Sequence, residues 1–167
     1  MLPNSRLHSV DSRGPDPVFN HLSRGTYVLV LYLLQDEVLT IGKLGHFSVL
    51  EGFYAYAGSA LGTGGLRGRL GHHLRPVQHP RWHLDYLRCV AILQSVWWTE
   101  GERRREHDWA ALLQQLPGAT LPVPRFGASD CTCASHLFHY AEQPSLGLFQ
   151  GLFTQRFPSE TVHSLAL

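Results

Sequence analysis

Five side chains in the sequence have the types needed to cut a phosphodiester bond. They are two tyrosines, an arginine, a histidine and a glutamate: Tyr27, Tyr56, Arg69, His73 and Glu106. Such hydrolysis needs a base for water, a cation for the developing negative charge and a Lewis acid at the leaving oxygen. A glutamate offers the hard oxygen ligand that Mg²⁺ prefers. The set therefore indicates a metal-dependent phosphodiesterase.

The stretch from Tyr54 to Leu74 is expected to supply half of this chemistry. An aromatic strand reaches Gly58, and residues 59–65 contain three glycines that let backbone approach a phosphate closely. Three leucines at four-residue spacing then predict a short helix over residues 66–74. Arg69 and His73 are also four residues apart, so they share a neighbouring face of that helix.

The elements before this stretch are expected to be strands. Residues 25–34 are rich in β-branched and aromatic side chains and nearly free of polar ones, as in a strand buried on both faces. A polar break precedes a second strand at residues 37–43, which predicts a hairpin between the two. Residues 45–52 are expected to be a short extended segment, and residues 53–58 are the next strand. Sequence-adjacent strands with short turns are expected to pair antiparallel.

The elements after this stretch alternate between helix and strand. Tyr27 and Tyr56 are expected to meet on one sheet face, and Glu106 is expected on the third helix. The spacing of apolar residues predicts a helix at 81–88, a strand at 90–98, a helix at 100–116, a loop at 122–134 and a strand at 135–140. The fold class is therefore α+β.

Composition bounds the domain organisation and the partners. The chain has 167 residues, a formal net charge of +1 and three cysteines. It therefore fits one globular domain in a reducing cytoplasm, with no global attraction to nucleic acid and no membrane span. Pro-rich residues 1–23 are expected to be a flexible extension, and residues 24–140 the domain. In the extension at residues 141–167, apolar positions predict a segment packed on the domain or on a second chain.

The order of these residues resembles the GIY-YIG nuclease family. Gly25-Thr26-Tyr27 is followed by Tyr56-Ala57-Gly58, by Arg69 eleven residues later and by a helical glutamate. Further segments are similar to the Uri-type branch of that family: 58–62 (GSALG), 82–87 (WHLDYL) and 126–137 (FGASDCTCASHL). The resemblance covers roughly residues 24–140. It implies a small three-stranded antiparallel sheet flanked by helices, here with an additional hairpin or strand and a C-terminal extension.

The resemblance also implies a role for each matching residue. It implies metal-dependent cleavage of nucleic acid, with DNA the expected substrate and Mg²⁺ or Mn²⁺ the cofactor. Tyr27 matches the tyrosine that acts as general base or positions water, Tyr56 matches the second tyrosine, and His73 lies one helical turn after the arginine. The arginine that stabilises the phosphorane matches Arg69, with Arg67 the alternative. The metal-binding glutamate matches Glu106, with Asp108 the fallback.

Other polar residues have a structural and a functional interpretation. Contacts to nucleic acid are expected from Arg67, Ser59, His72 and Arg75. The run from Arg103 to Arg105 is expected to be solvated helix-face charge, and contact with backbone phosphates is the alternative. Trp82 is expected to be structural, and His83 or Asp85 is expected to contact the residues of the site as a supporting partner. A non-catalytic nucleic-acid-binding module is the alternative function.

Cys131, Cys133 and His136 form a cluster that suits Zn²⁺, because thiolates and imidazoles bind that metal. A closed zinc site needs a fourth ligand, which would have to be Cys89, His139 or His79. The alternative is two ordinary thiols in a tight loop, with His136 hydrogen-bonded to backbone. The zinc interpretation would make the chain a zinc-stabilised interaction module.

Overall fold

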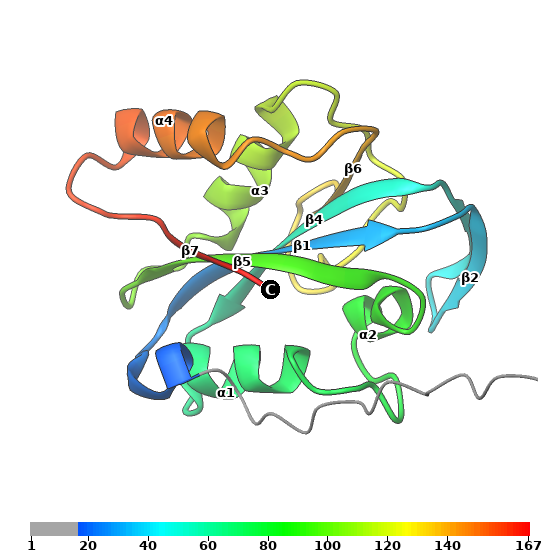
Figure 1. The fold of residues 1–167 in the computed structure, drawn as a ribbon, viewed down its shortest axis with the longest axis horizontal. Coiled ribbons are helices and arrows are strands. Elements are labelled where there is room, and N and C mark those ends of the chain that lie inside the picture. The colour runs from blue at the N-terminus through cyan, green and yellow to red at the C-terminus, as the bar shows by residue number, and fades with distance from the viewer. Residues whose placement is uncertain (1–16) are drawn as a thin grey trace, which may run out of the picture.

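The computed structural model of the chain describes residues 17–167, and its centre is a five-stranded antiparallel sheet. The strand order is β6-β4-β1-β5-β7, as Figure 1 shows. Their bounds are β6 (Leu137–Tyr140), β4 (Gly52–Ala60), β1 (Gly25–Leu33), β5 (Ile92–Glu100) and β7 (His163–Ala166). The α+β class with helices flanking an antiparallel sheet is confirmed, and short edge strands extend the three expected strands to five.

Within residues 17–167, four α-helices cover the two faces of this sheet, in pairs. α1 (Gly65–His73) and α2 (His83–Arg88) lie on one side, and α3 (Glu106–Gln115) and α4 (Leu146–Arg156) lie on the other (Figure 1). β1 is buried along almost its whole length because odd-numbered residues such as Leu29 enter the α1–α2 core and even-numbered ones such as Val30 enter the α3–α4 core. The predicted strand with two buried faces is confirmed.

The predicted hairpin between the first two strands is wrong. β2 (Glu37–Ile41) pairs with β3 (Gly45–Val49) in a separate two-stranded sheet, while β1 pairs with β4 and β5. β2 buries only alternate residues, which suits a ribbon with one solvated face, whereas the apolar β1 needs a partner on each edge.

The predicted third helix also starts later than expected. Its first residue is Glu106 rather than Glu100, because Glu100 ends β5 in register with Gly25. Gly101 follows at φ 150°, a conformation that breaks the strand before the helix begins. Helix α2 begins at His83, two residues after the predicted start.

Both predicted extensions contain ordered structure. Residues 1–16 of the expected flexible segment lie outside the described residues, but residues 17–21 form a 3₁₀ helix whose Phe19 is buried against Trp98. The C-terminal segment packs on its own domain: β7 pairs with β5, and Phe149 and Phe153 of α4 contact Trp109 of α3. Among residues 17–167, no helix is long and apolar enough to cross a membrane.

Candidate functional site

The pairing of β1 with β4 brings the two predicted tyrosines together. Tyr27 is opposite Gly58 and Tyr56 is opposite Leu29, so both phenol rings point to the α1–α2 face with their centroids 6.5 Å apart. A side-chain carbon at position 58 would lie 2.5 Å from the Tyr27 hydroxyl oxygen. The glycine of the second motif is therefore required by the tyrosine of the first.

Helix α1 adds His73 directly to Tyr27. His73 Nε2 and the Tyr27 hydroxyl oxygen are 2.9 Å apart, within hydrogen-bond distance, and the two side chains are buried. Burial, assisted by the nearby Arg88 guanidinium, lowers the pKa of His73 to about 3. The imidazole is therefore neutral at pH 7, and its tautomer decides whether it accepts the phenol proton or donates Nε2–H to a phenolate.

Both phenols are protonated at neutral pH in the structure. Burial raises the pKa of Tyr27 well above 10, and the nearby Tyr56 raises it further, whereas the Arg69 guanidinium opposes the shift. Burial likewise raises the pKa of Tyr56 to about 12. A phenolate at this position therefore requires more positive charge than the protein alone supplies.

Helix α3 contributes Glu106 at its first residue. The residue is 6% exposed, and its Oε2 atom is buried with no hydrogen-bond partner among the described residues. Its Oε1 atom lies 3.4 Å from Nε of Arg104 and 3.6 Å from Nε2 of His107. By contrast, Asp108 is ion-paired with Arg105 and Arg156. Glu106 therefore has an oxygen free for a cation, and Asp108 does not.

One pocket of about 450 Å³ joins all five predicted site residues. Three arginines against two carboxylates give it a positive balance, which favours an anionic ligand. The charged and polar side chains that line it are Tyr27, Tyr56, Ser59, Arg69, His73, Arg81, His83, Arg104, Glu106, Ser129, Asp130 and His136.

The predicted nucleic-acid contacts divide into one residue at the pocket and three elsewhere. Ser59 lines it, whereas Arg67 and Arg75 are exposed and do not line it. His72 is bonded to Asp85 Oδ1 at 3.1 Å. The geometry favours Arg69 over Arg67 as the arginine of the pocket, because their side chains leave α1 in different directions.

Arg81 and Trp82 line the same pocket and were not among the predicted contacts, and Arg104, for which phosphate contact was the alternative interpretation, lines it as well. The Arg69 guanidinium carbon lies 4.3 Å from the centroid of the Trp82 ring, a cation–π contact, and Trp82 is 42% exposed. Trp82 thus presents an aromatic surface at the pocket mouth rather than a purely structural side chain. Residue 82 was expected inside the helix predicted at 81–88 but lies just before α2, and its spacing did not indicate that the ring lines the pocket.

The residues expected behind the site hold α2 in place. His83 Nδ1 accepts the Gly127 N–H at 3.0 Å. Asp85 Oδ2 accepts hydrogen bonds from the backbone N–H groups of Arg81 and Trp82. Burial alone would raise the pKa of Asp85, but these two bonds and the neighbouring His72 together lower it. Protein contacts thus satisfy most polar atoms of the close group of His72, His73 and Asp85, but His73 Nδ1 is buried without a partner among the described residues.

The cysteine cluster acquires a fourth member that was not expected. Cys131 Sγ lies 3.4 Å from His136 Nε2, so the His136 side chain contacts a thiol rather than backbone. Cys89 is exposed, and His139 contacts the carbonyl of Glu51. The histidine that joins the cluster is His107 of α3. Burial and the neighbouring Cys131 raise the pKa of Cys133 to about 11.

His73 predicts a loss of stability in acid. Its folded pKa of about 3 is below the ordinary 6.5, so between these values the unfolded chain binds a proton that the folded chain does not. Stability is complete above this window and falls as pH decreases through it. From pH 7 to pH 5, urea titration should show a free-energy loss about 2 kcal/mol larger in the parent than in His73→Gln. His79→Gln is the control and should lose as much stability as the parent. Equal losses in the parent, His73→Gln and His79→Gln would contradict His73 as the source of the acid sensitivity.

The fold and pocket define an α+β domain with a cationic cavity beside a buried, incompletely paired carboxylate. Residues 26–155 match the family model described as "Domain of unknown function DUF123". The chain belongs to this family. No curated protein and no solved structure matches the chain.

Proposed function

We propose that the chain is a divalent-metal-dependent endonuclease that hydrolyses phosphodiester bonds in DNA. Glu106 carries the proposal, because its buried Oε2 has no partner among the described residues and it lines a pocket with Arg69 and two phenols. An unpaired buried carboxylate oxygen is costly. A hard cation that also contacts phosphate would satisfy it, so the residues present fit Mg²⁺ or Mn²⁺.

The order of elements supports a finer assignment to the GIY-YIG nucleases. The three central strands β4-β1-β5 are antiparallel, and helices cover both faces. The first motif lies on β1, the second on β4, the arginine on α1 and the glutamate on α3. This is the arrangement that the sequence resemblance implies, so fold and motif order support one proposal.

The mechanism uses the chain's own groups in distinct roles. Arg69 binds a non-bridging phosphate oxygen and stabilises the charge that develops as water attacks phosphorus. Tyr27, in its phenolate form, takes the proton of that water, while His73 orients the Tyr27 oxygen. The bond from phosphorus to the leaving oxygen then breaks. Glu106 would hold Mg²⁺, which when bound supplies Lewis-acid stabilisation of the leaving oxygen.

The surroundings of the pocket favour a nucleic-acid substrate. Arg81 and Arg104 are exposed cations that can contact phosphates on either side of the cleaved one. Trp82 is partly exposed, and the part of its ring that Arg69 leaves uncovered offers a surface for a base, since stacking on aromatic side chains is the usual way to hold unpaired nucleotides. These features favour single-stranded or branched DNA over a duplex, in which bases are already stacked.

A cleavage panel tests the proposal. Purified chain is incubated with labelled single-stranded, duplex, flap and branched oligonucleotides, with Mg²⁺, with Mn²⁺ or with neither. We expect cleavage only with the ion present. Arg69→Ala should lower the rate by about 10²- to 10³-fold, because it removes a donor to the developing charge.

Arg67→Ala is the matched control, since Arg67 is exposed on the same helix outside the pocket. It should cut at close to the parent rate. Binding that weakens steeply with salt, without cleavage of any substrate in either ion, would instead select the non-catalytic binding module.

A further inference from the structure

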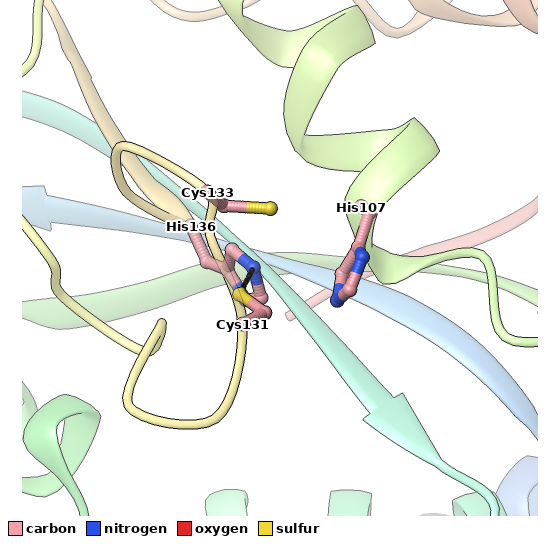
Figure 2. A group of neighbouring side chains, drawn as sticks. All are labelled: His107, Cys131, Cys133 and His136. Carbon is pink, nitrogen blue, oxygen red and sulfur yellow. Dashed lines mark hydrogen bonds between the residues drawn. The ribbon is translucent and has the colours of Figure 1, made fainter.

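Four metal-binding side chains from two separate segments converge beside the pocket. His107 is the second residue of α3, and Cys131, Cys133 and His136 come from the loop that leads into β6 (Figure 2). One ligand atom from each residue lies within 4.8 Å of the other three. We propose that these four residues bind one structural Zn²⁺ ion.

The ligand types and the spacing both fit this ion. Two thiolates and two imidazoles form a standard tetrahedral zinc set, whereas Mg²⁺ prefers oxygen. With bonds of about 2.3 Å to sulfur and about 2.0 to 2.1 Å to nitrogen, the tetrahedral edge from sulfur to nitrogen is about 3.6 Å. The observed separation of Cys131 Sγ from His136 Nε2 is 3.4 Å. Four protein ligands leave no open position, so the site is structural rather than catalytic.

The loop that carries three of the ligands has little regular structure of its own. No residue from 121 to 136 belongs to a helix or strand. Arg125 in this loop has a positive φ of 64°, and its guanidinium Nη1 donates to the Cys133 carbonyl. The loop is held by buried Val123 and Phe126 and by backbone hydrogen bonds such as that from His136 N to the Phe126 carbonyl. A metal would add a direct cross-link from this loop to α3.

The position of the cluster links it to the neighbouring pocket. His107 directly follows Glu106, and His136 lines the pocket while also belonging to the cluster. Zinc would therefore fix the first turn of α3, and with it the Glu106 carboxylate, against the loop. This consequence rests on the proposed function, whereas zinc binding itself does not.

Metal analysis of the full purified chain tests the site directly. We expect one equivalent of zinc per chain, and Co²⁺ added to metal-stripped protein should give the visible absorption of a tetrahedral thiolate site. Cys131→Ser with Cys133→Ser, and separately His107→Ala, should lose this binding. Cys89→Ser, which removes the exposed third cysteine, should retain it. Zinc removal should lower the melting temperature by roughly 10 °C or more.

Two results would overturn the proposal. One is stripped parent protein that takes up neither Zn²⁺ nor Co²⁺, a measurement that does not depend on whether any variant folds. The other is zinc content that is unchanged in the folded double cysteine variant. Glu106→Gln should keep its zinc, so zinc binding without cleavage rejects the nuclease proposal alone. Cleavage by parent protein that takes up neither Zn²⁺ nor Co²⁺ rejects the zinc proposal alone.

Discussion

Replacing Glu106 with glutamine should reduce Mg²⁺-dependent cleavage by about 10³-fold or more, equivalent to about 4 kcal/mol of transition-state stabilisation. Glutamine keeps the shape of the side chain but removes the anionic oxygen that is buried without a partner. The loss should be smaller at high Mg²⁺, because the amide still offers a weak oxygen ligand. Initial rates over a Mg²⁺ titration, with the folded fraction measured by circular dichroism, check this expectation.

Stability should move in a different direction from activity in this variant. Removing a poorly paired buried charge should leave Glu106→Gln at least as stable as the parent, as expected for a residue retained for function. Asp108→Asn is the matched control on the same helical turn, since its carboxylate is ion-paired with Arg105 and Arg156. Equal rates in Glu106→Gln and the parent, or a larger loss in Asp108→Asn, would contradict the role of Glu106.

The sequence predicted the part of the site that depends on local periodicity. Alternation along strands places Tyr27 and Tyr56 on one face once β1 and β4 pair, and four-residue spacing places Arg69 and His73 on one side of α1. Gly58 could be identified as a motif residue, but the requirement for glycine there comes from a tertiary contact. The Tyr27 ring occupies the space that a side chain at position 58 would fill.

Features that depend on long-range contact were missed. β2 pairs with β3 rather than with β1, because the apolar β1 gains more from two central neighbours than from a solvated ribbon. His107 joins Cys131 only through the packing of α3 against a loop 24 residues farther along the chain (131 − 107), and no spacing rule links them. Arg104 is exposed, as its neighbours predict, and its Nε atom also lies 3.4 Å from Glu106 Oε1.

Two metal sites of different chemistry would then meet at the first turn of α3. Glu106 offers a hard oxygen to the pocket. His107, the next residue, belongs to the cluster with Cys131, Cys133 and His136. A strong chelator removes both ions, so loss of cleavage in chelator alone does not identify the one used in catalysis. Omitting Mg²⁺ from zinc-loaded protein separates the two, since the structural ion stays bound.

Changing Tyr27 to phenylalanine should lower the cleavage rate by about 10²- to 10⁴-fold, the contribution of a general base. Burial raises the pKa of Tyr27 above 10, so the phenolate fraction rises tenfold for each pH unit below that value. The parent kcat/KM should therefore increase with pH across the neutral and mildly alkaline range, whereas the residual rate of Tyr27→Phe should lack this increase. A pH series of single-turnover rates measures both.

Tyr32→Phe is the matched control on the same strand, because the Tyr32 hydroxyl donates to Glu51 Oε1 at an exposed position and does not line the pocket. It should keep both the parent rate and the parent pH profile. Tyr27→Phe also leaves His73 Nε2 without its hydrogen bond, which should cost about 1 to 3 kcal/mol of stability. Rates must therefore be normalised to folded protein. If the normalised rate falls but the pH dependence persists, Tyr27 positions the water and another group takes the proton; if neither changes, the phenol has no part in the reaction.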